Sequence, residues 1–272
     1  MSTRDFILTL NIRGGTVTVI PPKRINFTAD KSISGQLNKL ELSIYGLSEK
    51  DRLALVKDAE DQKRIPISLQ VGYKGLIQSV YKGTILTGSN ERQGPDIVTK
   101  ISGLDGGFDA INSFTNRTVR GGKTALDSIL LDMPNTGEGK ITVRPVLTRP
   151  KILVGNSLKL IDEAVNVGET WYIENEQLYI ISDNEVVGRF IPVVSAKSGL
   201  ISTPSRQNKL VTFETEMNPS VVIGGRAQLL STTAPHLNGI YRVETISYSG
   251  DNYGDSWNMV CTGRLVGEVK VL

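Results

Sequence analysis

The sequence predicts a mainly β protein in which two antiparallel β-barrels flank a small α/β insertion. Short segments near both ends of the chain alternate apolar and polar residues, and this two-residue period places the apolar side chains on one face of a strand. Glycine-rich turns at hairpin spacing separate many of these segments. Apolar stripes at helical spacing occur chiefly in the middle of the chain, which predicts that most helices lie there.

Residues 1–107 are predicted to form the first barrel. Phe6 opens the first alternating segment, and Gly14-Gly15 follows with the freedom to adopt the positive φ angles of a tight hairpin turn. A second hairpin is predicted at 72–75, where two glycines again flank the turn. The predicted strands of this region are 6–12, 17–19, 40–44, 65–71, 76–86 and 97–104.

A short helix is expected within this first region. Ser48 has the chemistry of an N-cap, and Asp51 three residues later gives a start that is similar to a capping box. Leu53, Val56 and Ala59 follow at helical spacing. The pattern predicts a short helix that closes one end of the barrel.

Residues 108–195 are predicted to form the compact α/β insertion. Thr124 and Asp127 make a second cap pattern, and Pro134 ends the helix that follows. The apolar stripe of this helix comprises Leu126, Ile129, Leu130 and Met133.

A second helix and a hairpin complete the insertion. Asn156 or Ser157 caps the helix, and Gly168 is expected to stop it. Its apolar face is predicted to comprise Leu158, Ile161 and Val165. The hairpin is predicted over 171–181 with its turn at 174–176.

Residues 196–272 are predicted to form the second barrel. Trp257, Met259 and Cys261 recur at period two and therefore share one strand face. The stretch 195–208 is expected to be a linker between the insertion and this barrel. The predicted strands are 211–214, 221–223, 227–230, 240–248 and 257–261.

Composition excludes several classes of protein. Apolar residues make up 39% of the chain, which is enough for well-filled cores, and the net charge is only +3. A charge this small does not indicate a nucleic-acid footprint. Cys261 is the one cysteine and His236 the one histidine, so an internal disulfide and a Cys/His zinc site are excluded. The sequence shows no secretory signal and no apolar run long enough for a membrane helix, and we expect folding in a reducing cytoplasm.

Two glycine-containing motifs lack the residues that their chemistry needs. The segment 121–124 precedes a helix, but a phosphate-binding loop requires a glycine where Arg117 stands. The segment 251–255 would need an oxygen ligand and a glycine at the positions of Tyr253 and Ser256 to bind calcium. We interpret the first motif as a turn into a capped helix and the second as a hairpin turn.

No catalytic constellation is predicted, and neither are cofactor-binding or metal-binding residues. A catalytic triad could use only His236, which lies in a loop, and the sequence has no nucleophile elbow. Cys261 lies in an apolar alternating strand and is expected to be a buried packing residue. Asp105 and Asp109 flank two glycines and could face each other, but a turn at a domain junction is the favoured interpretation. The sequence therefore predicts a protein that is not an enzyme.

Four blocks keep a fixed order of strands, turns and a helix along most of the chain. They are 38–48; 72–85 together with 98–106; 171–180; and a C-terminal run that comprises 199–204, 211–214, 217–219, 223–225, 237–243 and 250–257. In order and spacing these blocks resemble the baseplate hub family of bacteriophage tails, which is related to the spike-carrying proteins of type VI secretion.

The resemblance implies a role in assembly. Hubs of this kind form homotrimers in which each subunit contributes two barrels similar to the tail tube protein. The three subunits then form a pseudo-sixfold ring between the hexameric tail tube and the trimeric central spike. The resemblance further implies a virion location in the baseplate of a contractile tail, with other baseplate proteins and the tape-measure protein as further partners. DNA would pass through the ring without specific binding, and the spike would be a separate polypeptide.

Two alternatives remain open from the sequence. One is a peptidoglycan-degrading enzyme of the tail tip, which would need two carboxylates across a sugar cleft. The other is a different β-rich tail component, or the hub or spike base of a secretion system or a tailocin. For the hub, we expect the two barrels to line the channel and the insertion to face outward, because an insertion is tolerated better on the outside of a ring than in its lumen.

Overall fold

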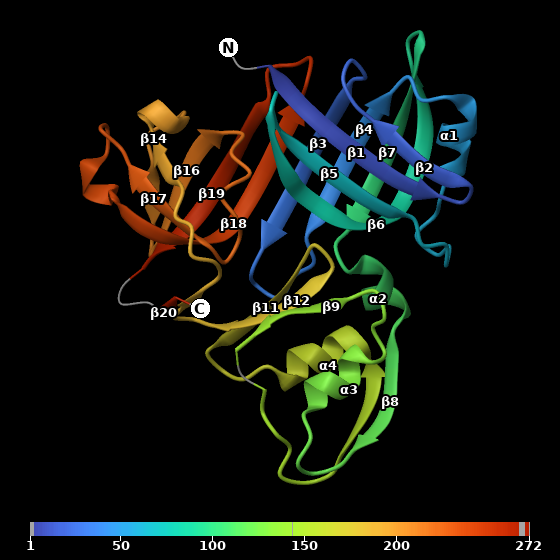
Figure 1. The fold of residues 1–272 in the computed structure, drawn as a ribbon, viewed down its shortest axis with the longest axis vertical. Helices are drawn as coiled ribbons and strands as arrows, with labels where there is room; N and C mark the ends of the chain where they lie inside the picture. The colour runs from blue at the N-terminus through green and yellow to red at the C-terminus, as the bar shows by residue number, and fades with distance from the viewer. Residues whose placement is uncertain (1–2, 143, 267–269, 272) are drawn as a thin grey trace.

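The computed structural model describes residues 3–142, 144–266 and 270–271. It confirms the mainly β class, and the largest element is a 13-stranded sheet. Along its main path the strands are ordered β15-β16-β19-β18-β3-β4-β7-β6-β5-β1-β2, and β17 pairs with both β18 and β14. A smaller α/β unit lies below this sheet in the view of Figure 1.

We divide the molecule into a first flank, a middle unit and a last flank. The first flank contains β1 (Arg4–Ile12), β2 (Gly15–Val19), β3 (Ile25–Ser32), β4 (Lys39–Tyr45), α1 (Glu49–Ala54), β5 (Pro66–Tyr73), β6 (Leu76–Gln93) and β7 (Asp96–Leu104). The middle unit contains α2 (Gly107–Asn112), β8 (Phe114–Val119), α3 (Ala125–Leu130), β9 (Gly137–Ile141), β10 (Lys151–Asn156), α4 (Ser157–Ala164), β11 (Glu169–Glu174) and β12 (Gln177–Ser182). The last flank contains β14 (Val193–Ser195), η1 (Ala196–Ser198), β15 (Ser205–Gln207), β16 (Leu210–Glu216), β17 (Arg226–Leu230), η2 (Pro235–Leu237), β18 (Gly239–Asp251) and β19 (Trp257–Leu265). A separate parallel pair joins β13 (Glu185–Val186) to β20 (Lys270–Val271).

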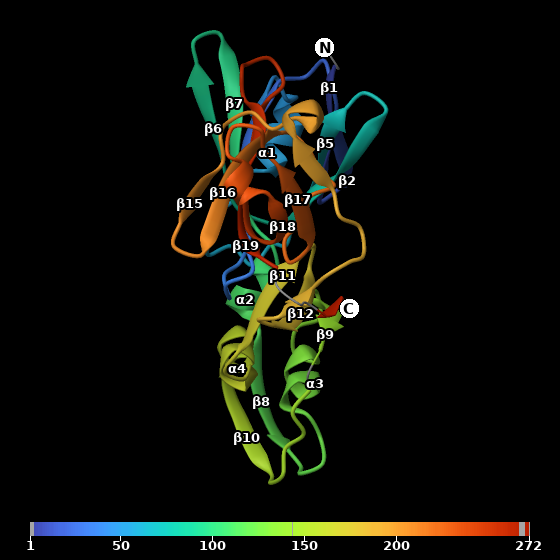
Figure 2. The ribbon, with the colours of Figure 1, turned by 90° about the vertical axis from the view of Figure 1, so that its left-hand side faces the viewer.

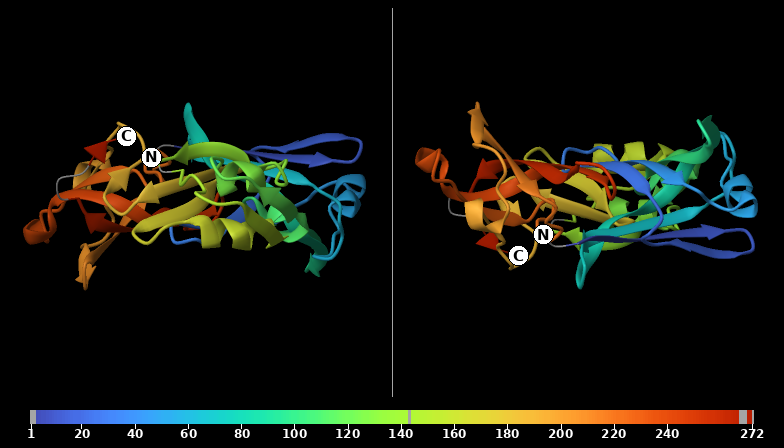
Figure 3. Two further views of the ribbon diagram at one scale, coloured as in Figure 1. Left: turned by 90° about the horizontal axis from the view of Figure 1, so that it is seen from below. Right: turned by 90° about the horizontal axis from the view of Figure 1, so that it is seen from above.

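The strand β3 joins the two flanks into one sheet. It pairs antiparallel with β4 of the first flank on one side and with β18 of the last flank on the other. Seen from above and below, the two flanks lie at opposite ends of the molecule with these central strands between them (Figure 3). The two flanks therefore share one continuous sheet, whose main strand path ends at β15 and β2.

Alternation explains most of the large sheet. Phe6, Leu8 and Leu10 of β1 are fully buried, as their spacing predicts. Trp257 and Cys261 of β19 are buried on one face in the same way. A single hydrophobic core runs through both flanks and includes residues from β1, β3, β16 and β19.

The β11–β12 hairpin separates this large core from a second core in the middle unit. Tyr172 and Ile181 belong to the large core, whereas Trp171 and Ile173 belong to the second one. The two strands are therefore buried on both faces, which is why their sequence is almost continuously apolar. Figure 2 shows the hairpin between the large sheet and the helices α3 and α4.

The predicted helix caps of the middle unit are confirmed. The Thr124 side chain accepts a hydrogen bond from the Asp127 N–H at the start of α3, and the Asn156 side chain caps α4. The helix α4 buries Leu160 and Ile161 and ends at Ala164, before the predicted stop at Gly168.

Three local predictions are wrong. The helix α1 begins after its predicted cap Ser48, but it ends at Ala54 and buries none of its six residues, so Val56 and Ala59 lie outside it. Leu53 and Val56 are 59% and 52% exposed, because the chain turns inward only at Leu55 after the helix ends. The segment 221–223 is a succession of turns and no strand, because the Val221 and Gly225 N–H groups bond carbonyls three residues back. The expected linker at 195–208 instead contains η1 and β15.

Candidate functional site

The residues that the sequence singles out for chemistry lie apart in the fold. His236 is exposed in η2, and Cys261 is fully buried in β19, where burial raises the pKa of its thiol. Gly121-Gly122 forms a turn that leads to the Thr124 cap of α3. Within the described residues, no group of His, Cys, Asp and Glu side chains has an arrangement that could hold a metal ion.

The structure does show a set of polar junctions that fasten the three parts of the molecule together. The first junction is centred on Asp105, which follows β7 and is 1% exposed. Its carboxylate accepts hydrogen bonds of 2.6 Å from the Asn175 N–H and 2.7 Å from the Glu176 N–H. Both donors lie in the β11–β12 turn, where positive φ angles of 55° and 61° aim two successive N–H groups the same way. Asp105 therefore holds the tip of the hairpin against the first flank.

Charged side chains of the first flank complete this junction. Lys31 of β3 is an almost fully buried partner of Glu174, at 2.6 Å between Nζ and Oε1. Asn38 donates to the Ile173 carbonyl at 2.7 Å and to the Glu174 carboxylate at 2.9 Å. Glu176 pairs in turn with Arg64 and Lys82, at 2.7 Å and 3.4 Å. The hairpin turn is thus bound through charge-assisted hydrogen bonds.

Asp105 has an unusual environment for a carboxyl group. Burial, and then the nearby negative charge of Glu174, raise its pKa from 3.8 to about 8. The two backbone hydrogen bonds oppose this change without cancelling it. Four buried polar atoms near this junction have no partner among the described residues, and they belong to Arg64, Tyr81, Thr84 and Asn175.

Asp109 holds a different part of the middle unit. It accepts hydrogen bonds from the Asn135 N–H at 2.8 Å and the Asn135 side chain at 2.7 Å, and from the Thr136 hydroxyl at 2.9 Å. The two acids that sequence analysis places at a junction turn are therefore both structural acceptors, and each holds its own segment. Gly106 between them has a φ of 68°, and a Cβ there would come within 2.7 Å of the Ile173 side chain.

Arg242 provides a second junction, which sequence analysis missed. It lies in β18, is 4% exposed, and donates to the backbone carbonyls of Asp183 at 2.7 Å and of Ser182 and Glu185 at 3.3 Å. Its other nitrogen pairs with Glu244 at 2.7 Å. Arg242 thus binds the last flank to the segment 182–185, where the chain continues beyond β12. Arg242 is a basic residue among apolar neighbours of a strand. This charge in an apolar segment is the sequence signal that could have indicated a polar contact.

A third junction joins the two flanks at the β18–β19 turn, the segment with a superficial likeness to a calcium loop. Asp251 accepts hydrogen bonds of 2.9 Å from the Tyr253 and Gly254 N–H groups, as in an Asx turn, and pairs with Arg24 at 2.7 Å. Arg4 donates to the carbonyls of Asp251 and Gly254. Burial raises the pKa of Asp251, but the hydrogen bonds from Arg24 and the turn outweigh burial and lower it overall. The interpretation as a hairpin turn is confirmed.

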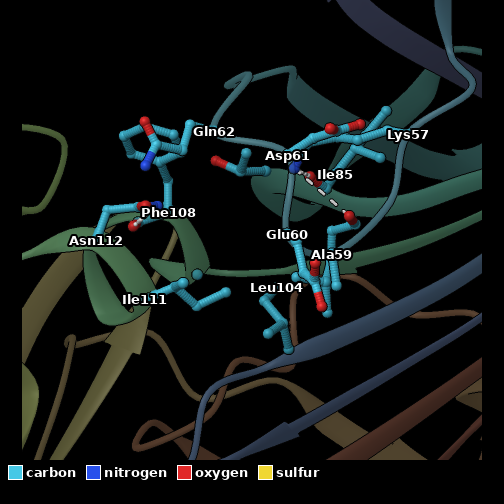
Figure 4. A pocket seen from close by; sticks show the side chains of 13 residues that line it. Lys57, Ala59, Glu60, Asp61, Gln62, Ile85, Leu104, Phe108, Ile111 and Asn112 are labelled. Atoms are coloured by element: carbon cyan, nitrogen blue, oxygen red, sulfur yellow. Dashed lines mark hydrogen bonds between the residues drawn. The ribbon is translucent and has the colours of Figure 1, made fainter.

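A small cavity lies where the first flank meets α2 (Figure 4). Its volume is about 100 Å³, and it is lined by the 57–62 loop, β6 and α2. Lys57 is 5% exposed and donates to the Ile85 and Leu86 carbonyls at 3.1 Å and 3.4 Å. Burial lowers the pKa of its ammonium group. Because these hydrogen bonds go to backbone carbonyls of β6, Lys57 links the 57–62 loop to that strand and has a structural role.

Comparison with solved structures identifies the class of fold. A tail protein from Neisseria meningitidis MC58 has a TM-score of 0.60 and 13% sequence identity over 95% of this chain and 96% of that chain. The 43 kDa tail protein of prophage MuSo2 from Shewanella oneidensis has a TM-score of 0.65 and 10% identity, with 95% and 96% covered. The E. coli c3393 protein, a component of the type VI secretion system, has a TM-score of 0.64 and 9% identity, with 95% and 77% covered. The fold is thus one shared by tail proteins and a type VI secretion component.

The family follows from the sequence match. The chain belongs to the baseplate hub gp41 family, whose model matches residues 7–263. A comparison with curated proteins finds no match. Membership confirms the resemblance seen in the sequence and indicates a structural role in a tail baseplate. Within the described residues, no helix combines the length and apolarity that crossing a bilayer would require.

Proposed function

We propose that three copies of this protein form a ring that connects the hexameric tail tube to the central spike and encloses part of the DNA conduit. The observation that carries this proposal is the match to the baseplate hub family over residues 7–263. The continuous sheet supports it, because two β-rich flanks in one rigid subunit let a threefold ring offer six similar surfaces. The predicted units 1–107, 108–195 and 196–272 would supply two channel-lining parts and one outward part.

The outer face of the central strands is a suitable wall for a conduit. One row of paired residues across β16, β19, β18, β3 and β4 comprises Glu214, Val260, Ser247, Asp30 and Lys39. The next row comprises Glu216, Asn258, Ser249, Thr28 and Glu41. The two rows hold four carboxylates and one ammonium group, with hydroxyl and amide groups between them. Such a face does not attract phosphates, so DNA would pass without being held.

The ends of the large sheet suit closure of a ring. The strands β2 and β15 end its main path and each has one edge without a partner strand in the described residues. Unpaired strand edges favour pairing with another chain, and a closed ring removes them from solvent. We therefore propose that neighbouring copies meet through these edges, while the tube protein and the spike bind the two ends of the ring.

The oligomeric state tests this proposal. Light scattering on the purified protein should give a mass near three times the 29.7 kDa of one chain, and adding its tube protein should give a heavier complex that contains three copies. A protein that stays monomeric in both samples would contradict the ring. The proposal also holds that the protein is not an enzyme, so purified cell walls should not clear when it is added. Measurable clearing would favour the alternative of a peptidoglycan-degrading tail-tip enzyme.

A second candidate is the hub of a secretion-system or tailocin spike. The similarity in fold to a type VI secretion component is the observation that favours it. Both candidates share the ring and the spike and differ in what the tube carries. The location in a virion, synthesis in the host cytoplasm, a contractile tail and contact with the tape-measure protein belong to the first candidate. Purified virions should contain the protein if that candidate is correct.

A further inference from the structure

The middle unit ends in a two-stranded ribbon, β8 with β10, that is covered on one face only. The helices α3 and α4 pack against that face, where Val119 and Leu153 are buried. On the opposite face Phe114, Ile152 and Val154 are 61%, 71% and 56% exposed. The strand register places these three side chains together with Asn116 and Thr118 on one side. Three large apolar side chains on one exposed face indicate a surface that another molecule covers.

The ribbon also has two free edges. Among the described residues, β8 and β10 pair only with each other, so each strand has a row of backbone N–H and C=O groups without a partner strand. A two-stranded ribbon of this kind is a ready template for a third strand. In Figure 2 the ribbon extends away from the large sheet, at the far end of the long axis.

Four cations gather at the outer end of the ribbon. Arg120 and Lys123 lie in the turn after β8, Arg149 lies just before β10, and Lys151 is the first residue of β10. Backbone hydrogen bonds of 2.8 Å and 2.9 Å between the segments 120–124 and 146–148 hold these two stretches side by side. We call these four residues the basic tip. All four are exposed, and none forms an ion pair with another described residue.

The basic tip contrasts with other cations of the same unit. Arg117 pairs with Asp132, and Arg144 pairs with Asp127 and Glu138. Residues 113–165 contain eight basic and five acidic residues, a net charge of +3 that equals the net charge of the whole chain. The middle unit as a whole, residues 107–182, has eight basic and nine acidic residues, so this positive charge is local to the ribbon and the helices that cover it.

We propose that the β8–β10 ribbon is a docking site for an extended, acidic and apolar segment of a partner protein. Apolar side chains of that segment would cover Ile152 and Val154, its backbone would pair with a free edge, and its carboxylates would meet the basic tip. A protein partner fits better than nucleic acid, because the cations lie next to a face with three exposed apolar side chains, which phosphates would not cover. This proposal extends the proposed hub function, since the partner would be another protein of the baseplate.

Fluorescence anisotropy with labelled peptides tests the proposal on the full-length protein. The probe is a short peptide of alternating Glu and Val, and the comparison peptides replace Glu with Lys or Val with Ser. The Glu-Val peptide should bind at least about tenfold more tightly than either comparison peptide. Binding should weaken with added salt, because the tip residues are exposed. Equal binding of all three peptides, or no binding of the Glu-Val peptide, would overturn the proposal.

Variants locate the site. The double substitution Arg120→Glu with Lys151→Glu should weaken binding of the Glu-Val peptide at least about tenfold, and Ile152→Ser should weaken it severalfold. The matched control is Lys50→Glu, an exposed lysine of α1, which should leave binding unchanged. Circular dichroism shows whether each variant is folded. If the control weakens binding as much as the tip variants do, attraction is general and the site is refuted.

Two further probes test other occupants. A DNA duplex and phosphatidylglycerol vesicles should both bind more weakly than the Glu-Val peptide, and tighter binding of either would contradict a protein partner. The tip variants should keep the mass that light scattering gives for the unaltered protein. A wild-type protein that stays monomeric both alone and with its tube protein, and still binds the peptide, would therefore refute the ring and leave the ribbon site intact. A trimer that does not bind the peptide would refute the ribbon site and leave the ring intact.

Discussion

The large sheet and the middle unit are held together by different kinds of contact. The two flanks share a single apolar core and a continuous strand ladder, in which β3 contributes Ile25, Phe27 and Ala29 to the interior. The middle unit has its own core, and polar contacts from Asp105 and Arg242 reinforce its attachment to the flanks. Apolar burial is strong and non-directional, whereas these hydrogen bonds specify one orientation. The flanks therefore form a rigid body, and the middle unit is a part whose position depends on a few residues.

The largest effect should come from the strand that the flanks share. Phe27 is 1% exposed and packs edge to face against Trp257, with 5.9 Å between the ring centroids. Phe27→Ala should lower the free energy of unfolding by about 3–5 kcal/mol, through lost burial and the cavity that remains. Urea unfolding followed by tryptophan fluorescence and by circular dichroism measures this change. Because β3 belongs to both flanks, the two should unfold in one transition; two separate transitions of the sheet would contradict a single body.

A smaller and more local effect is expected at the hairpin turn. Asp105→Ala leaves the Asn175 and Glu176 N–H groups without their acceptor and should cost about 2–3 kcal/mol. Hydrogen exchange followed by mass spectrometry should show faster exchange in β11 and β12 while the large sheet stays protected. The matched control is Glu49→Ala on the exposed helix α1, which should change neither the stability nor the hydrogen exchange of β11 and β12. Uniformly faster exchange would show that the middle unit and the flanks are equally coupled.

The same carboxyl group predicts a dependence on pH. The pKa of Asp105 is raised to about 8 in the folded protein, so the folded state holds this proton more tightly than the unfolded chain does. Its contribution to stability is complete below about pH 4 and is lost as the pH rises through about 8. Urea midpoints measured across this range should fall more steeply for the unaltered protein than for Asp105→Asn. Parallel curves for the two proteins would show that Asp105 does not titrate in this range.

The smallest effect should come from the ion pair between the flanks. Arg24 is 43% exposed in its pair with Asp251, so Arg24→Ala should cost only about 0.5–1 kcal/mol, and less at high salt. The lowered pKa of Asp251 means that this contribution is present near neutral pH and lost on acidification. Thermal melts at low and high salt measure it. A loss as large as that of Phe27→Ala would contradict the view that apolar burial joins the flanks.

Sequence reasoning worked where one strand face is apolar and the other polar. It identified β1, β4 and β19, and it located the caps of α3 and α4. It missed β3, because the fourth inward position of that strand is Lys31, whose partner Glu174 lies far away in the sequence. It also missed β8 and β10, since Phe114 of β8 and Ile152 and Val154 of β10 are apolar on the exposed face and obscure the alternation. Their exposure is what a docking surface requires.

The junctions were predicted only in part, for a related reason. Asp105 and Asp109 stand on either side of Gly106-Gly107, a pair that marks a turn, but the groups that the two acids bind are distant in sequence. Arg242 has no local signal besides a charge in an apolar strand. Contacts that depend on distant segments require the fold before they can be assigned. The family resemblance succeeded because it used the order of whole blocks along the chain.

The most direct test of the account is an electron cryo-microscopy map of the assembled tail tip. The account predicts three copies around the channel, with six β-rich flanks continuing the symmetry of the tube. The face that contains Ser247 and Asp30 should line the lumen, and the β8–β10 ribbon should point outward. A map with six copies of the chain in the ring, or with the ribbon inside the lumen, would contradict the proposed hub.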